Sequence, residues 1–390
     1  MDVAGGRGGD ETQRLGRALA PDTLAVRGGF DPGLGDGTAP PIHMATTFVT
    51  PGDPQPGVPA YGRAGNPGFL PFERTMAELE GGVEAVAFNA GVAVTVAIFD
   101  EVPPGGVLVM PTDVYYGFRV YAEDVLKPRG VNVRYVDMTD LAALDSALGG
   151  AAFLWTETPT NPLLSVVDLT AAGDLAKRHG VPWACDNTFA SPLLQHPLRH
   201  GAAASMHSAT KSIGGHSDVI MGVAVCADGA FAARLRARRS QYGSQPNGFS
   251  CWLARRGLQT MPLRVRRQSA SALEIAMRLS AHPAVERVYH PGLPGHPGHA
   301  IAARQMSGGF GGVLSFLVKG GAANAQRTID ALQVMVPATS LGSVETLIER
   351  RARWSGEIAD PALLRCSVGI EDIEDLWRDL DRALTRSASA

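Results

Sequence analysis

The chain has 390 residues, of which 45% are hydrophobic and 19% charged, and its formal net charge is −3 at pH 7. This is the composition of an ordinary globular protein that is long enough for two domains with substantial cores. There is no basic stripe for nucleic acid, no apolar signal core at the N-terminus, and no apolar run of the roughly 18 residues that a transmembrane helix needs. We therefore expect a cytoplasmic protein without a membrane partner.

The first 70 residues divide into two parts. Residues 1–20 are rich in glycine and charge without periodicity, which predicts a disordered tail. Residues 21–70 contain P-P-I-H-M-A-T-T-F, a Pro/Gly loop at 51–59 and the segment Tyr61-Gly-Arg63-Ala-Gly-Asn66-Pro67. From its residues alone, this last segment is a turn.

A helix, a strand and a glycine turn follow. Residues 73–79 have helical apolar spacing and end at Gly81-Gly82, residues 83–88 form an apolar strand, and Asn89-Ala90-Gly91-Val92 opens another helix. Free amide N–H groups and the helix dipole at such a turn favour a phosphate. Many α/β proteins have similar turns, so this signal alone is weak.

Short apolar strands then alternate with helical segments, which predicts a mostly parallel sheet. The strands are expected at 107–111, 131–136 and 151–156 and within V-P-W-A-C and A-A-A-S-M-H. Ligands bind at the carboxyl ends of such strands. Polar motifs follow three of them: Glu157-Thr-Pro-Thr-Asn161, Asp186-Asn-Thr188 and the lysine loop at 205–218. The sequence therefore predicts one site built from these strand ends.

The lysine loop reads S-M-H-S-A-T-K-S-I-G-G-H-S-D and holds a single lysine, Lys211. Hydroxyls at Ser208 and Thr210 can donate to phosphate oxygens, and a lysine amine forms a Schiff base with an aldehyde. Enzymes that use pyridoxal phosphate (PLP) also need an acidic partner for the pyridine nitrogen, and Asp186 is the candidate. A solvated surface lysine and a helix-capping aspartate are the alternatives.

From about residue 259 the pattern changes to long amphipathic helices. Arg264, Arg266 and Arg267 are predicted to form a solvated helix face. Strands at 312–318 and 362–368 predict a second, smaller sheet. Arg365 lies within an apolar strand, where a charge is costly unless it is paired, which favours an anion site. The four cysteines are widely spaced without a C-x-x-C pair, so we expect reduced core thiols and no metal site.

The run H-S-A-T-K-S-I-G-G-H-S-D-V-I-M-G resembles the lysine signature of the Cys/Met-metabolism family of PLP enzymes, which includes cystathionine γ-synthase, cystathionine γ-lyase, cystathionine β-lyase and methionine γ-lyase. The resemblance covers about residues 21–385. It implies an α/β, aspartate-aminotransferase-like PLP-dependent transferase fold, with a large, mostly parallel sheet domain and a smaller C-terminal α+β domain. The domains would be an N-terminal arm at 21–70 that contacts the neighbouring subunit, a PLP-binding domain at 71–258 and a C-terminal domain at 259–390.

The resemblance also implies residue roles. The catalytic residues would be Lys211, Tyr115 and Asp186, although the adjacent Tyr116 leaves open which tyrosine stacks on the cofactor. The cofactor would be bound by Tyr61, Arg63, Gly91, Val92, Tyr115, Asn161, Asp186, Thr188, Ser208, Thr210 and Lys211. In the family, the matching tyrosine and arginine hold the phosphate of the neighbouring subunit, so a homo-oligomer, probably a dimer of dimers, is implied.

The substrate residues implied by the resemblance are Asn161, Thr339, Ser340 and Arg365. They predict γ-elimination or γ-replacement on a γ-substituted L-amino acid, as in transsulfuration, with lyase and synthase both open. The chain has Thr339 where many cystathionine-handling members have glutamate, and R-R-A-R-W-S-G-E replaces P-A-x-M-T-H. An unusual γ-substituted amino acid of specialised metabolism is therefore an alternative. A non-catalytic, regulatory PLP-binding protein is the alternative of another class, and Lys211, Asp186 and Arg365 together argue against it.

Overall fold

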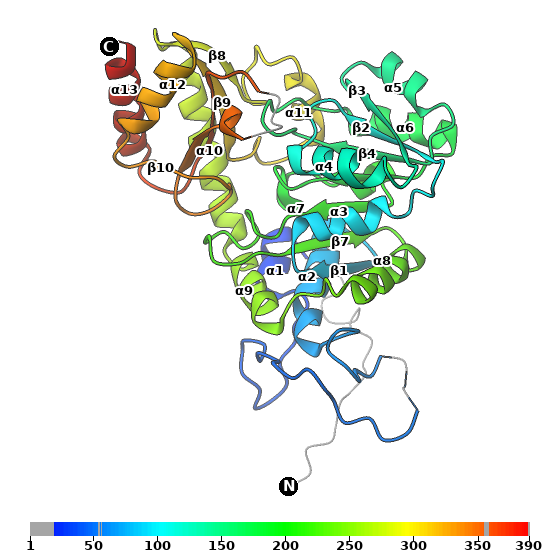
Figure 1. Ribbon diagram of the computed structural model, residues 1–390. Helices are drawn as coiled ribbons and strands as arrows, with labels where there is room; N and C mark the ends of the chain where they lie inside the picture. The colour runs from blue at the N-terminus through cyan, green and yellow to red at the C-terminus, as the bar shows by residue number, and fades with distance from the viewer. Residues whose placement is uncertain (1–18, 54, 56, 355–358, 389–390) are drawn as a thin grey trace.

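The computed structural model describes residues 19–53, 55, 57–354 and 359–388, so the predicted tail at 1–20 lies almost wholly outside the described residues. A seven-stranded sheet and a five-stranded sheet form the two bodies of the molecule, and the N-terminal arm extends from the lower end of the larger body (Figure 1). The predicted α/β architecture, a large sheet domain with a smaller C-terminal domain, is confirmed.

The large sheet has the strand order β1-β7-β6-β5-β4-β2-β3. Its strands are β1 (Glu84–Phe88), β2 (Val107–Pro111), β3 (Asn132–Val136), β4 (Phe153–Glu157), β5 (Trp183–Asp186), β6 (Ala204–His207) and β7 (Gly222–Cys226). Neighbouring strands from β6 to β3 are parallel, whereas β7 runs opposite to both of its neighbours. The sheet is mostly parallel, as predicted, and β4, β5 and β6 end side by side.

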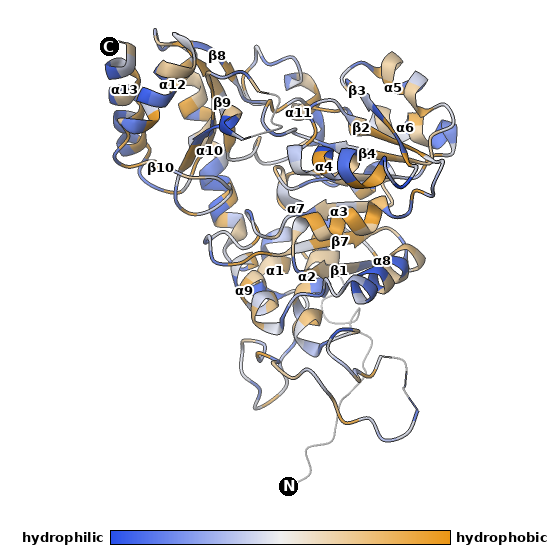
Figure 2. Cartoon of the chain, in the orientation of Figure 1, coloured by the Kyte–Doolittle hydropathy of each residue, from blue (hydrophilic) through white to orange (hydrophobic). Residues whose placement is uncertain are grey.

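Helices cover both faces of this sheet, which explains why its strands are apolar almost throughout. One face packs against α2 (Leu70–Glu80), α5 (Leu141–Leu148), α6 (Leu169–His179) and α9 (Gly248–Leu258). The other packs against α3 (Gly91–Phe99), α4 (Tyr116–Tyr121) and α8 (Gly229–Tyr242). Shorter elements are α1 (Pro21–Arg27), η2 (Pro67–Phe69), η3 (Ala122–Leu126), α7 (Ser191–Leu194) and η4 (Pro197–His200). Most of these helices are mixed in hydropathy, whereas α3 is apolar along its length (Figure 2).

The small sheet has the order β10-β11-β12-β9-β8. Its strands are β8 (Val285–Tyr289), β9 (Val313–Val318), β10 (Val336–Pro337), β11 (Leu347–Arg350) and β12 (Leu363–Ser367). The helical elements of this part of the chain are α10 (Met261–Ser280), α12 (Gly321–Asp330), η5 (Arg351–Arg353) and α13 (Ile373–Ala388), whereas α11 (His299–Gln305) packs on the large-sheet body. The long helix α10 starts beside the large sheet and ends against the small one, so it connects the two bodies (Figure 1).

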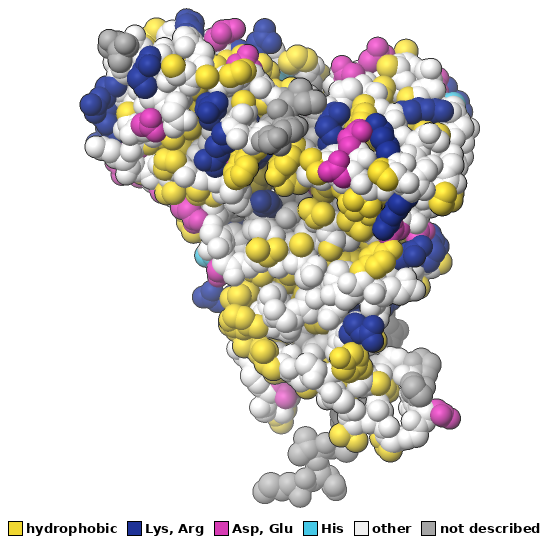
Figure 3. Space-filling model, viewed as in Figure 1, with side chains coloured by type: hydrophobic (Ala, Val, Ile, Leu, Met, Phe, Trp, Pro, Cys, Tyr) yellow, Lys and Arg dark blue, Asp and Glu magenta, His cyan; other side chains and the backbone are white. Residues whose placement is uncertain are grey.

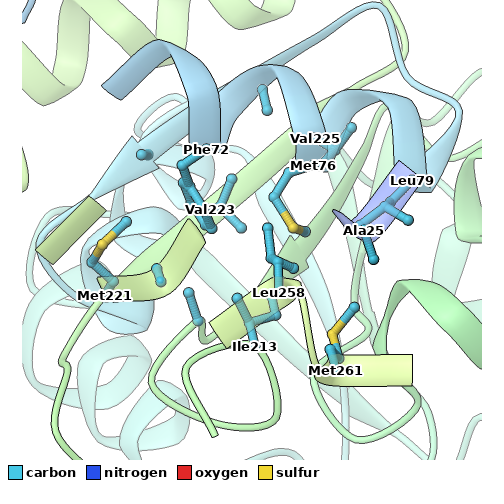
Figure 4. Close-up of a cluster of buried hydrophobic side chains, with 14 of the residues drawn as sticks. Ala25, Phe72, Met76, Leu79, Ile213, Met221, Val223, Val225, Leu258 and Met261 are labelled. Atoms are coloured by element: carbon cyan, nitrogen blue, oxygen red, sulfur yellow. The ribbon is translucent and has the colours of Figure 1, made fainter. Parts of the chain in front are cut away.

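The core beneath the lysine loop is a cluster of apolar side chains from distant parts of the chain. Phe72 and Met76 of α2 meet Val223 of β7, and Ile213 of the lysine loop packs with Leu258 at the end of α9 (Figure 4). Ile213 is 1% exposed, so this packing holds the loop to the sheet. The four cysteines are buried, Cys251 in this same cluster and the other three in the other clusters of the core. None of the helices in the described part of the chain has the length and apolar character needed to cross a membrane.

Candidate active site

A cavity of about 450 Å³ lies where the carboxyl ends of β4, β5 and β6 face the small sheet. All the predicted cofactor and substrate residues line it except Tyr61 and Arg63. The lining residues from the prediction are Gly91, Val92, Tyr115, Asn161, Asp186, Thr188, Ser208, Thr210, Lys211, Thr339, Ser340 and Arg365. The structure therefore brings these residues together from segments up to 274 positions apart in the chain, the interval from Gly91 to Arg365.

Lys211 reaches into the cavity from the lysine loop. Its Nζ donates a hydrogen bond of 2.9 Å to Oγ of Ser340, which has a positive φ of 87° on the facing loop. Burial and the positive charge of Arg365 together lower the pKa of Lys211 to about 8, against the opposing attraction of Glu349. An amine with this pKa loses its proton near neutral pH far more readily than an exposed lysine does.

Arg264 of α10 is buried beneath the lysine loop, so the prediction that it belongs to a solvated face is wrong. Its guanidinium donates to the carbonyl oxygens of Ser212 and Gly257, each at 2.7 Å, and it is 4% exposed. Burial lowers its pKa to about 10. An amphipathic pattern cannot distinguish this arginine from the exposed Arg266, because the loop that covers it lies some fifty residues earlier in the chain.

The N-terminus of α3 faces the lysine loop across the cavity. Gly91 approaches so closely that an added Cβ would lie 3.0 Å from Ser208. Ser208 N–H donates to Oγ1 of Thr188 at 2.9 Å. The hydroxyl of Thr210 donates to the carbonyl oxygen of Met221 at 3.1 Å, so its proton is already engaged within the protein. The free amides of the helix terminus and the hydroxyl of Ser208 form a donor set that fits a phosphate group.

Two buried carboxyl groups stand at the ends of adjacent strands. Glu157 and Asp186 are register partners at the ends of β4 and β5. Glu157 accepts backbone hydrogen bonds of 2.8 Å from Tyr115 and from Asn161. Burial and the nearby charge of Asp186 raise the pKa of Glu157 well above its usual value. Burial also raises the pKa of Asp186, while bonds from Thr188 and the charges of His207 and Lys211 oppose the shift.

Tyr115 and Tyr116 both line the cavity, with their rings 5.2 Å apart and edge to face. Tyr115 also packs edge to face on Phe118, at 5.1 Å between ring centroids. Burial raises the pKa of Tyr115. Tyr116 lies instead beneath Arg351, whose guanidinium carbon is 6.0 Å from the ring centroid. Tyr115 is thus the tyrosine fixed against the large-sheet core, and Tyr116 faces the small domain.

Arg365 forms the wall opposite the lysine. It donates to Oδ1 of Asn161 and to the carbonyl oxygen of Ser340, both at 2.9 Å, and it is 3% exposed. The bond to Oδ1 orients the Asn161 amide so that its Nδ2 is the group left to donate into the site. Arg365 also pairs with Glu349. A buried guanidinium held in this way is suited to binding a carboxylate.

Sequence reasoning missed several cavity residues. Arg351 and Trp354 line the cavity from the segment that departs from the family pattern, so that departure was the available signal. Glu349 lies behind them and accepts from Arg351 at 2.7 Å and from Trp354 at 3.0 Å. Its pKa is lowered, because the charges of Arg365 and Arg351 and the bond from Trp354 outweigh burial. No sequence pattern marked Glu349, because its pairing with Arg365 forms only when β11 and β12 lie side by side in the folded small domain.

Tyr61 and Arg63 lie outside the cavity of their own chain. Tyr61 is 51% exposed, and the Arg63 guanidinium lies 5.6 Å from the Tyr61 ring centroid on the N-terminal arm. The predicted role of this pair in a neighbour's site therefore stays a prediction.

Comparisons with known proteins agree with this geometry. The model of the "Cys/Met metabolism PLP-dependent enzyme" family matches residues 22–385. The chain is 41% identical over 374 residues to a cystathionine gamma-synthase of Mycobacterium leprae, covering 93% of this chain and 96% of that protein. It is 39% identical over 364 residues to a cystathionine gamma-lyase of Dictyostelium discoideum, covering 89% and 92%.

A solved structure shows the same fold. It is the cystathionine gamma synthase of Xanthomonas oryzae pv. oryzae in complex with cystathionine, with a TM-score of 0.91, 36% identity, and coverage of 95% of this chain and 99% of that one. The family match and these relatives extend over the large sheet, the small sheet and the cavity between them. The chain therefore belongs to the Cys/Met metabolism family of PLP-dependent enzymes.

Proposed function

We propose that the protein catalyses elimination or replacement at Cγ of an L-amino acid, with Lys211 as the residue that carries the cofactor and moves the Cα proton. The observation that carries the proposal is that Lys211, Asp186 and Arg365 line one cavity. They provide an amine for the aldehyde, a carboxylate for the ring nitrogen and a guanidinium for the substrate carboxylate. The relatives support the reaction class, since they are named as a γ-synthase and a γ-lyase.

Each residue has a distinct task in this proposal. Bound pyridoxal phosphate supplies an aldehyde that bonds to amines and a ring that accepts electrons from the substrate's Cα. Lys211, with its pKa of about 8, would hold the cofactor and would then accept the Cα proton. Asp186 would keep a proton on the ring nitrogen through its negative charge. Tyr115 would bind against the cofactor and move protons near the leaving group, and Tyr116 is the alternative for this task.

Binding of the phosphate is assigned to the cradle between α3 and the lysine loop. The amides of Gly91 and Val92 and the hydroxyl of Ser208 would donate to it, with Thr188 and Thr210 completing the wall. Tyr61 and Arg63 of a neighbouring subunit would add a ring and a bidentate guanidinium. These donors at the start of α3 belong to the backbone, so they do not depend on the side chains of Asn89, Ala90 and Val92.

The substrate end of the cavity is assigned to Arg365, Asn161, Thr339 and Ser340. Arg365 would bind the α-carboxylate, and Asn161 would donate from Nδ2 to the cofactor's phenolic oxygen and the substrate. The second candidate function, action on an unusual γ-substituted amino acid, is favoured by Arg351 and Trp354 in the cavity wall. At position 339 the wall has a threonine where many cystathionine-handling members have a glutamate, and a guanidinium and an aromatic ring line the space instead, so a distal group without the ammonium of cystathionine would suit it.

A substrate screen tests the reaction and separates its two outcomes. The holoenzyme would be supplied with O-acylhomoserines, cystathionine, homocysteine, methionine and γ-halogenated amino acids, each with and without a thiol nucleophile. We expect turnover of at least one γ-substituted amino acid. Keto-acid release would identify elimination, and a new thioether would identify replacement. Turnover confined to β-substituted amino acids would contradict the proposal.

We further propose a homodimer-based assembly, a tetramer built as a dimer of dimers, in the cytoplasm. The N-terminal arm carries exposed apolar side chains that a second copy of the chain would cover, namely Leu34, Ile42, Met44, Val49 and Val58. Figure 3 shows apolar side chains on this arm and on the face above it. Without the neighbour's Arg63, the phosphate cradle would lack its guanidinium.

A further inference from the structure

A buried carboxylate lies behind the small-sheet wall of the cavity, and the reaction proposed above gives it no task. Glu349 of β11 is 1% exposed and lies outside the cavity lining. Its Oε1 accepts from Arg365, from Arg351 at 2.7 Å and from Oγ1 of Thr339 at 3.3 Å. Its Oε2 accepts from Nε1 of Trp354 at 3.0 Å. All four of these partners line the cavity.

Strand pairing places this carboxylate against the guanidinium of Arg365. Glu349 and Arg365 are register partners in the antiparallel pair β11 and β12, so their side chains lie on the same face of the small sheet. Arg351 and Trp354 follow within the next five residues, and Thr339 comes from the loop between β10 and β11. The two ends of the proposed substrate site therefore meet at one side chain.

We propose that Glu349 is a positioning residue for substrate recognition, which holds the guanidinium of Arg365 and the distal wall of the cavity as one unit. The distal wall is the pair Arg351 and Trp354. Recognition of the α-carboxylate at one end of the substrate then depends on side chains at the other end. The inference rests on the proposed task of Arg365, but not on which γ-substituent leaves.

The partners of Arg365 explain why Glu349 would control its orientation. A guanidinium binds a carboxylate through two parallel hydrogen bonds, so the plane of the fork has to be fixed. Asn161 and the carbonyl of Ser340 are neutral acceptors for it, whereas Glu349 has a lowered pKa and is ionised at neutral pH. A charge-assisted bond is roughly twice as strong as a neutral one. Since both side chains are buried, water competes little with this pair.

The link to the distal wall uses the second oxygen of the carboxylate. Trp354 donates its single indole N–H to Oε2, whereas Arg365 bonds to Oε1. Loss of the indole bond would leave the carboxylate freer to rotate, and the acceptor of Arg365 would move with it. Arg353 also donates to Oε2, but 41% of its side chain is exposed, so water competes with that bond. Trp354 is therefore the distal residue whose change should be felt at Arg365.

The test measures how strongly the holoenzyme prefers a ligand that has an α-carboxylate. L-norvaline and n-butylamine share their amine and carbon chain and differ by the carboxylate, so the ratio of their dissociation constants, measured by titration calorimetry, reports its recognition. An effect of Glu349 on Lys211 acts on both ligands alike and cancels in the ratio. Wild-type protein should prefer norvaline. Glu349→Gln should reduce this preference by about tenfold, the effect of one charge-assisted hydrogen bond.

Charge alone predicts the opposite sign. Removal of a negative charge makes the wall more positive, which would strengthen the binding of norvaline. A preference that rises or stays unchanged in Glu349→Gln therefore overturns the proposal. Trp354→Phe keeps an aromatic ring but loses the N–H, so it should reduce the preference by about threefold. Combined with Glu349→Gln it should add no further loss, whereas additive losses would show that the two side chains act separately and would contradict the proposal.

Asp379→Asn is the matched control. Asp379 is also a buried carboxylate of the small domain, 4% exposed and paired with Arg382 at 2.6 Å, and it accepts from the backbone of residues 333–335, away from the cavity. It should keep the wild-type preference even if it lowers stability. An equal loss of preference in Asp379→Asn would mean that any weakening of the small domain has this effect, and the proposal would fall.

Two further outcomes are decided by the same measurements. If Glu349→Gln does not fold, Trp354→Phe carries the test, because Trp354 is 39% exposed and its replacement disturbs the core little; an unchanged preference in it then refutes the proposal. Wild-type protein without a preference for norvaline would refute the task of Arg365 and this inference with it. A normal preference without any γ-reaction in the substrate screen would refute the proposed function alone.

Discussion

Arg365 is the residue whose loss should damage catalysis most without removing the cofactor. Truncating one partner of a buried charge pair costs about 2–5 kcal/mol, so Arg365→Ala should lower kcat/KM by roughly 30- to 4,000-fold. Arg365→Lys should recover part of the loss, since a point charge cannot reproduce the planar fork. Steady-state kinetics measure the loss, and borohydride reduction followed by peptide mapping should still find the cofactor on Lys211.

Arg353→Ala is the control for this variant. Arg353 also donates to Glu349, at 3.1 Å, but it is outside the cavity lining and 41% of its side chain is exposed. Its removal should change kcat/KM little. If Arg365→Ala instead turned over amino acids normally while losing the cofactor or unfolding, Arg365 would be structural.

Individual residues also show which parts of the site could be predicted from the sequence and which could not. The strand-end motifs identified the cavity because parallel strands bring their carboxyl ends together, whatever the length of the connections. Arg264 and Glu349 could not be identified in this way. Arg264 bonds a loop some fifty residues earlier in the chain, and Glu349 pairs with Arg365 only because β11 and β12 lie side by side, and no short motif records either contact.

Among the elements, the lysine loop is held in place from outside the large sheet by Arg264 of α10, which donates to the carbonyl oxygen of Ser212. Arg264→Met would remove the donor from the carbonyls of Ser212 and Gly257, and an unsatisfied buried polar group costs about 1–3 kcal/mol. We expect a lower thermal midpoint and faster release of pyridoxal phosphate, followed by the loss of its visible absorbance.

The control for Arg264→Met lies on the same helix. Arg266 is exposed and pairs with Asp22 at the surface, at 2.6 Å, an interaction worth no more than about 1 kcal/mol. Arg266→Met should leave cofactor release unchanged. Equal effects of the two variants on release would mean that Arg264 supports α10 in general and not the loop.

At the scale of the whole molecule, the shared site makes a prediction about mixed assemblies. Arg63→Ala and Lys211→Ala chains should each be nearly inactive alone. After subunit exchange, one site of each hybrid dimer has both wild-type groups, so random pairing in a two-fold dimer should restore about a quarter of the wild-type activity. Activity assays after mixing, with exchange verified by native mass spectrometry, provide the measurement.

The control mixture contains Arg63→Ala chains and chains that carry both substitutions. None of its hybrid sites has both wild-type groups, so its activity should not rise. Proven exchange of Arg63→Ala with Lys211→Ala chains without any gain in activity would show that Arg63 does not complete a neighbour's site.

The two walls of the cavity come from different sheets. Substitutions that alter the substrate can therefore occur in one wall without altering the residues assigned to the cofactor in the other. Gly91, Asp186 and Lys211, which are assigned to the cofactor, belong to the large-sheet body, whereas Ser340, Arg351 and Trp354 belong to the small one, Arg351 in η5. A gene can therefore accumulate substitutions in the small-sheet wall and acquire a new substrate while the cofactor chemistry stays under unchanged selection. Relatives named for different reactions then diverge from this chain to a similar degree, as the 41% and 39% identities of a synthase and a lyase illustrate.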